Sequence, residues 1–333
     1  MKNILAPVIL CGYERGGTTL LSEILAQNGY QSGFECGVLM CKTPREFINF
    51  NPYFHEFPNW WKIPKNDIDD IVNTDSHLEF YSKAIEKSGC FKINQFDVLK
   101  FFDKTPIYMS QLGFVMSNLN FSSKVIVIHR DPRSVFVSWA KRRKNSSQTV
   151  EQDILSNINT LSKRYLNYFS GSIFHKGRRN VLFVSFEQLC LDIENHLSII
   201  GHFLDGHRFN NIEGPVRYNN VTSSKIDQSK IFEYTKYISK DTGDLILENN
   251  KLASDFFANL DERVKYGKWF AEKEEAIMSL LGMFDIKDKY VEIDGVFFDA
   301  PRYLFRYNDV LDARVNPIKH WQSNGKREGR LPH

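Results

Sequence analysis

The sequence lacks both a paired cysteine pattern and a strong charge of one sign. Its five cysteines are odd in number and form no Cys-x-x-Cys pair, so they offer no zinc site and favour a reducing compartment over a disulfide-bonded secreted scaffold. The formal net charge is only +3, whereas a dedicated nucleic-acid binder has a strongly basic surface. We therefore expect no metal and no nucleic-acid partner.

Long hydrophobic runs are also missing. The apolar stretch at residues 7–11 is too short for a membrane span or a usual signal peptide, which favours a cytoplasmic protein. The sequence has no internal repeat and no low-complexity tract, and its 42% hydrophobic and 14% aromatic residues exclude disordered and fibrous classes. A chain of 333 residues is long enough for one large α/β domain, so we expect a single domain over residues 1–333.

A glycine-rich run follows that apolar stretch. Residues 12–21 read Gly-Tyr-Glu-Arg-Gly-Gly-Thr-Thr-Leu-Leu, and Gly12 and Gly17 have the spacing of the Gly-x4-Gly-Lys-[Ser/Thr] phosphate loop between a strand and a helix. Thr18 stands where that loop needs its lysine, and the cation is Arg15 inside the loop. The pattern predicts a loop that binds an anion without hydrolysing ATP. The alternative is a strand-turn-helix junction that binds nothing.

The residue types of this loop suit a phosphate group. Gly16 and Gly17 allow backbone N–H groups to converge on phosphate oxygens. Thr18 and Thr19 add hydroxyl donors, and the helix that follows points its positive end at the same place. We expect these four residues and Arg15 to bind the same anion.

A second anion site is predicted at the end of another buried strand, residues 124–129, which is apolar and rich in β-branched side chains. The strand leads to Arg130, and the Asp-Pro sequence that follows is typical of a helix start. On that helix Ser134, Ser138 and Arg142 are spaced four residues apart, so they share one face near Arg130. This face and Arg130 can bind a second phosphate.

Two anion sites at the ends of two strands of one parallel sheet indicate a nucleotide with phosphates at two separate places. In these residues the chain resembles the sulfotransferases that use 3'-phosphoadenosine 5'-phosphosulfate (PAPS). The family's loop, commonly Arg-Ser-Gly-Thr-Thr, binds the 5'-phosphosulfate and is similar to residues 15–19, which read Arg-Gly-Gly-Thr-Thr. Its 3'-phosphate site, an arginine that ends a strand and a serine eight residues later, matches Arg130 and Ser138. The resemblance implies a three-layer α/β fold of P-loop type, with a central parallel sheet flanked by helices and with helical insertions.

Two further matches concern the chemistry. Residues 103–106, Asp-Lys-Thr-Pro, resemble a segment of bacterial and tyrosylprotein-type members whose lysine reaches the transferring sulfuryl group, which implies that role for Lys104. Glu35 lies 20 residues after Arg15, one residue out of register with the glutamate that takes the acceptor proton in tyrosylprotein-type members. The alternatives are a loop lysine and an ordinary surface glutamate.

The resemblance implies PAPS as co-substrate, 3'-phosphoadenosine 5'-phosphate (PAP) as product, no metal, and an acceptor hydroxyl on a glycan, a tyrosine, a lipid or a small metabolite. Arg15 and Lys104 would stabilise charge on the transferring group, and Glu35 would be the base. Two other functions stay open. A kinase-like P-loop phosphotransferase needs a loop lysine and an acidic metal ligand, for which only Asp103 is a candidate. A non-catalytic nucleotide-binding module would need neither Lys104 nor Glu35.

The segments outside these motifs are expected to shape the rest of the site. We expect acceptor-side insertions at about residues 36–100 and 145–180, and a helical C-terminal part from about residue 241. Residues 223–226 are candidates for the loop that covers the adenosine, and the basic tail at residues 326–330 is a candidate to close over the cofactor. The alternative for both is a solvated polar segment.

Overall fold

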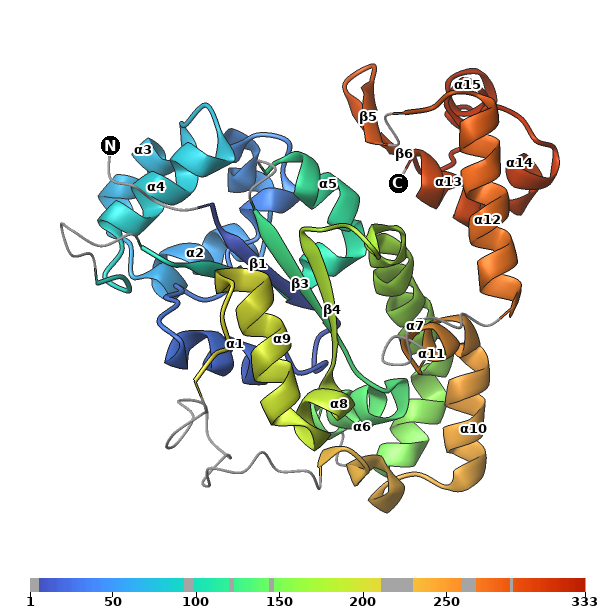
Figure 1. The fold of residues 1–333 in the computed structure, drawn as a ribbon, viewed down its shortest axis with the longest axis horizontal. Coiled ribbons are helices and arrows are strands. Elements are labelled where there is room, and N and C mark those ends of the chain that lie inside the picture. The colour runs from blue at the N-terminus through green and yellow to red at the C-terminus, as the bar shows by residue number, and fades with distance from the viewer. Residues whose placement is uncertain are drawn as a thin grey trace.

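The computed structural model describes residues 6–92, 99–119, 123–143, 147–210, 230–258, 268–287 and 290–332. Its central sheet has four parallel strands in the order β2-β1-β3-β4 (Figure 1). The strands are β1 (Val8–Gly12), β2 (Phe102–Lys104), β3 (Lys124–His129) and β4 (Val181–Ser185). Because all four run in one direction, their carboxyl ends meet at one edge of the sheet, where ligands of such folds bind.

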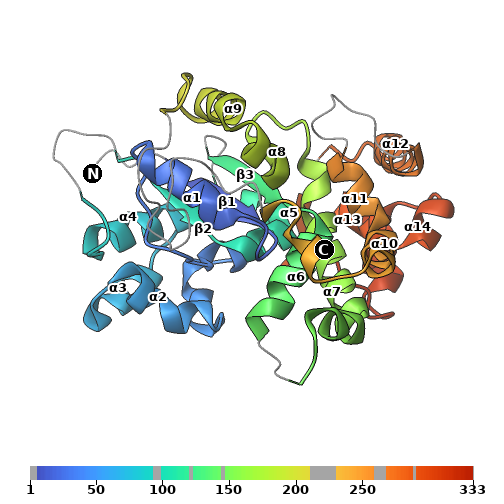
Figure 2. The same ribbon diagram turned by 90° about the horizontal axis from the view of Figure 1, so that it is seen from below.

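Helices cover both faces of this sheet. On one face, alternate strand residues such as Leu10 and Ile126 pack against helices from the N-terminal and later parts of the chain, namely α1 (Thr18–Gln27), α8 (Phe186–Leu191) and α9 (Ile193–Asp205). On the other face, residues such as Ile9 and Val127 pack against a larger group of helices, among them α5 (Leu112–Ser117), α6 (Pro132–Arg143) and α7 (Val150–Ser172). Figure 2 shows α8 and α9 on one side of the sheet and α6 and α7 on the other. The predicted three-layer α/β fold is confirmed.

The segment between α1 and β2 is helical and contributes most of its aromatic residues to the core. It contains α2 (Tyr53–Trp61), α3 (Ile68–Val72) and α4 (His77–Lys87), with short 3-10 turns at Val38–Met40, Pro44–Asn49 and Lys65–Asp67. Trp61, Phe57 and Phe80 are completely buried. Tyr53 and Trp60 are only partly buried and pack at the edge of the same core. The segment therefore supports the sheet edge beside β2.

The C-terminal part forms a smaller core of its own beside α5 and α7 (Figure 1). After α10 (Lys240–Asn249) and α11 (Lys251–Ala258) it comprises α12 (Lys268–Met283), the antiparallel hairpin of β5 (Tyr290–Ile293) and β6 (Val296–Asp299), α13 (Ala300–Arg306), α14 (Asn308–Asp312) and α15 (Pro317–His320). The ring of Phe297 lies 5.1 Å from that of Phe114 on α5, and Lys42 pairs with Glu292 at 2.7 Å. None of the described helices has the length and apolar character that crossing a membrane requires.

Candidate active site

The glycine-rich loop joins β1 to α1 at the carboxyl edge of the sheet. Gly17 has a φ of 102°, and a Cβ there would lie 2.4 Å from the ring of Phe186, so only glycine fits this position. No side chain caps the N-terminus of α1, and its first turn holds no acidic residue. The first amides of α1 therefore remain available to an anion, and the helix dipole favours negative charge there. Thr18 is buried and Thr19 is exposed at this helix start.

Three arginines that the sequence places in this region come together around the loop. Arg15 donates from Nε to Ser138 Oγ at 3.1 Å, and Arg130 donates to the carbonyl oxygen of Arg15 at 3.3 Å and to that of Lys230 at 2.7 Å. Partial burial, together with the neighbouring Arg142, lowers the pKa of Arg15. Burial also lowers the pKa of Arg130.

None of these three guanidinium groups is in direct contact with a carboxylate, although Glu187, Glu233 and Asp131 lie near enough to Arg130 to raise its pKa against the effect of burial. Among the residues that the structure describes, Arg15, Arg130 and Arg142 form no ion pair within 4 Å, whereas Arg133 and Arg164 each pair with a carboxylate. Like charges held close together cost free energy, which a bound anion offsets. The cluster is therefore arranged to bind negative charge.

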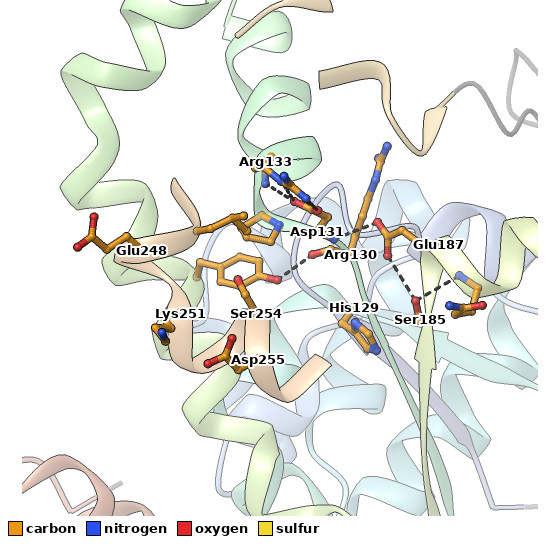
Figure 3. Close-up of a pocket in the computed structure, with 14 residues that line it drawn as sticks. His129, Arg130, Asp131, Arg133, Ser185, Glu187, Glu248, Lys251, Ser254 and Asp255 are labelled. Atoms are coloured by element: carbon orange, nitrogen blue, oxygen red, sulfur yellow. Dashed lines mark hydrogen bonds and ion pairs between the residues drawn. The ribbon is translucent and has the colours of Figure 1, made fainter. Parts of the chain in front are cut away.

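The strand end that carries Arg130 is supported from several sides (Figure 3). Tyr165 on α7 donates its hydroxyl to the carbonyl oxygen of Arg130 at 2.7 Å, and the amide of Asp131 donates to Glu187 at 3.0 Å. The guanidinium of Arg130 lies 4.3 Å from the centre of the Phe186 ring, an attractive cation–π contact. A cavity of about 830 Å³ is lined by Arg130, Tyr165 and Glu187, among other residues. Ser134, on the face predicted to be shared with Ser138, instead donates to the carbonyl oxygen of Ile231 and is buried.

Lys104 and Glu35, predicted from separate segments, form an ion pair. Lys104 Nζ donates to Glu35 Oε1 at 2.8 Å, and their side chains are only 8% and 18% exposed. Lys104 pairs in register with Leu10, two residues before the phosphate loop begins. A second cavity, of about 610 Å³, is lined by Lys104 and Thr19 and extends along α1. The pair thus lies beside a space large enough for a small molecule.

Phe34 is a part of the site that the sequence motifs did not identify. Its ring lies 3.9 Å from Lys104 Nζ, and its φ of 127° falls in a region that side chains other than glycine rarely adopt. Such strain is typical of functional sites, where the surrounding structure holds it in place. A phenylalanine between Gly33 and Glu35 carries no sequence signal for this conformation.

Asp103 is completely buried and serves the loop that carries Glu35. Its carboxylate accepts hydrogen bonds from the hydroxyls of Tyr81 at 2.6 Å, Tyr108 at 2.8 Å and Thr105 at 2.6 Å, and from the amide of Cys36 at 3.4 Å. Burial raises the pKa of Asp103, and these hydrogen bonds oppose the rise. With its oxygens occupied in this way, Asp103 holds β2 and the residues after Glu35 together and is not placed to bind a metal.

Two weaker sequence expectations have different outcomes. Residues 223–226 lie outside the described residues. In the basic tail, Lys326 pairs with Asp294 and Arg330 with Asp309, all within the C-terminal part. Both cations thus have carboxylate partners in the same part of the chain, and closure of the tail over the cofactor stays a prediction.

An anion-binding loop at the carboxyl edge of a parallel sheet, with a second cluster of arginines nearby, is the arrangement of an α/β nucleotide-binding protein. The comparison with known families is more specific: the sulfotransferase domain matches residues 5–249, so the chain belongs to the sulfotransferase family. The prediction of a PAPS-dependent sulfotransferase is thereby confirmed.

Several solved structures that resemble part of this chain are sulfotransferases. The sulfotransferase domain from the Synechococcus PCC 7002 olefin synthase is 17% identical with a TM-score of 0.49, over 74% of this chain and 95% of that one. The sulfotransferase domain from the curacin biosynthetic pathway is 18% identical with a TM-score of 0.46, over 74% and 98% of the two chains. A mouse sulfotransferase complexed with PAP is 14% identical with a TM-score of 0.41, over 78% and 89%. No curated protein matches this chain.

Proposed function

We propose that this protein transfers a sulfuryl group from PAPS to an acceptor hydroxyl, with the donor held at the two arginine-lined positions. The 5'-phosphosulfate binds the loop residues Arg15, Gly16, Gly17, Thr18 and Thr19. The 3'-phosphate binds a second group made of Arg130, Ser138 and Arg142. The observation that carries this assignment is the cluster of guanidinium groups that, among the described residues, form no ion pair within 4 Å, linked by the hydrogen bond from Arg15 to Ser138.

The proposed chemistry is an in-line transfer. The acceptor oxygen attacks sulfur, the bond from sulfur to the 5'-phosphate oxygen breaks, and the electron pair of that bond remains on PAP. Arg15 and Lys104 stabilise the charge on the sulfuryl and bridging oxygens, by analogy with phosphoryl transfer. Glu35 accepts the acceptor proton. The 2.8 Å ion pair between Glu35 and Lys104 supports a base and a cation that act side by side. The products are a sulfate ester and PAP.

We further propose that the whole chain acts as one sulfotransferase domain. Residues 36–100 and 145–180 would then shape the acceptor side, and the helical part from about residue 241 would complete the domain. Candidate acceptors are a glycan, a peptide tyrosine, a lipid or a small metabolite. The structure describes all five cysteines and shows no disulfide among them, which supports a reducing, cytoplasmic location.

Mixing the protein with PAPS and a panel of hydroxyl-bearing acceptors, and measuring PAP release, tests this function. We expect release above the rate of PAPS hydrolysis with at least one acceptor class, and loss of that release in Lys104→Ala. The kinase-like alternative has weaker support because Thr18 replaces the loop lysine and Asp103 is occupied by four hydrogen bonds. Phosphoryl transfer from ATP with magnesium, in place of PAP release, would overturn the proposal.

A further inference from the structure

One face of α7 contacts both parts of the donor site. We define the α7 face by Arg164, Tyr165 and Tyr168, which lie within about one helical turn. Arg164 forms an ion pair with Glu14 of the phosphate loop, and the Tyr168 hydroxyl donates to the same carboxylate at 3.1 Å. The α7 face therefore binds the residue that directly precedes Arg15.

The same face fixes two further points. The ring centre of Tyr13, the loop residue before Glu14, lies 5.2 Å from that of Tyr165 and 4.8 Å from that of Tyr168. Tyr165 also donates its hydroxyl to the carbonyl oxygen of Arg130 at 2.7 Å (Figure 3). One rigid helix thus connects the loop after β1 with the end of β3.

Glu14 is an unexpected residue in a loop that binds an anion, because a carboxylate next to Arg15 repels the phosphosulfate. Its pairing with Arg164 neutralises that charge and holds the side chain on α7. Arg15 itself has a φ of 68°, a conformation that costs free energy for a residue other than glycine. The α7 face holds the preceding residue, Glu14. Arg15 itself is held by its hydrogen bond to Ser138 and by the hydrogen bond that its carbonyl oxygen accepts from Arg130.

The distance between the two phosphate sites matters for a donor that carries both phosphates. Such a ligand gains affinity from the second site only when both sites have the spacing that the ligand requires. Building on the function proposed above, we propose that the α7 face is a positioning platform. Arg164, Tyr165 and Tyr168 fix the phosphate loop and Arg130 relative to each other, so that the 5'- and 3'-phosphates of the donor bind together.

Calorimetric titration with PAP, adenosine 5'-phosphate and adenosine 3'-phosphate tests this role. Arg164→Ala frees Glu14 and the loop, so we expect the affinity for PAP and for adenosine 5'-phosphate to fall about tenfold, the effect of losing a charge-assisted contact, while adenosine 3'-phosphate binds as before. Tyr165→Phe keeps the ring against Tyr13 and loses the bond to Arg130, so it weakens PAP and adenosine 3'-phosphate instead. Arg164→Lys restores most of the lost affinity, and Lys163→Ala, at the exposed neighbouring position, leaves all three affinities unchanged.

Unchanged PAP affinity in Arg164→Ala, or an equal loss for all three nucleotides, would overturn the platform. Should Arg164→Ala fail to fold, Tyr168→Phe removes one hydroxyl from Glu14 and keeps the ring, and the same criterion of selective loss applies to it. A failure of the donor assignment is distinguishable, because the wild-type protein would then show no preference for PAP over either monophosphate.

Discussion

The ion pair between Lys104 and Glu35 predicts how catalysis responds when either partner is removed. Lys104→Ala removes a cation from the developing charge, which typically costs about 3–4 kcal/mol, or roughly 10²–10³ in kcat. Glu35→Gln removes the base, which contributes on the order of 10²–10⁴. The two side chains are 2.8 Å apart and act in one step. The variant that combines Lys104→Ala and Glu35→Gln should therefore show a smaller fold-loss of kcat than the product of the two single fold-losses.

The same pair affects stability in a way that separates folding from catalysis. The side chains are 8% and 18% exposed, so removal of one partner leaves a largely buried charge, at about 3–5 kcal/mol. The double variant Lys104→Met and Glu35→Gln removes both charges. We expect it to recover most of the free energy of unfolding and to remain inactive.

Two measurements check these expectations. PAP release at saturating PAPS, with an acceptor identified on the wild-type protein, gives kcat, and urea unfolding gives the free energy of unfolding. PAP affinity should stay close to that of the wild type, because the lost interactions belong to the transition state. Turnover of Lys104→Ala near that of the wild type would refute the assignment.

Two further predictions concern the loop and the response to pH. Gly17→Ala should abolish PAP binding in calorimetry, because a Cβ would meet Phe186 at 2.4 Å, whereas Gly29→Ala, also at positive φ but with nothing within 4 Å, should cost only about 1 kcal/mol of stability and spare binding. Burial lowers the pKa of His129 to about 3. Between about pH 6.5 and pH 3, the unfolded chain therefore binds a proton at His129 that the folded chain does not bind. The free energy of unfolding falls as the pH falls through this window. In that window His129→Gln should reduce the slope of unfolding free energy against pH by up to about 1.4 kcal/mol per pH unit. Equal slopes for the wild-type protein and His129→Gln would contradict this account of His129.

The sequence predicts the parts of this protein that depend on local patterns. The apolar strands and the glycine spacing define the loop and the parallel sheet, because strand burial and phosphate-loop geometry are local properties of the chain. The four-residue spacing placed Ser138 and Arg142 on one helix, and in the structure Arg15 reaches Ser138 across 123 positions of sequence.

The remaining features depend on contacts between distant segments. Nothing around Asp103 in sequence indicates that Tyr81, Tyr108 and the amide of Cys36 converge on it. Nor does any local signal predict the strained φ of Phe34. Single-sequence patterns do not encode which loops meet, because tertiary packing decides it.

Calorimetric comparison of PAP with ATP and magnesium tests the central claim most directly, with Arg130→Ala as the test variant. Arg143→Ala is the matched control, because Arg143 already pairs with Asp153 at 3.6 Å. The two-phosphate site predicts that PAP binds roughly tenfold or more tightly than ATP with magnesium, and that only Arg130→Ala removes this advantage. A preference for ATP with magnesium, or PAP binding that is indifferent to Arg130, would contradict it.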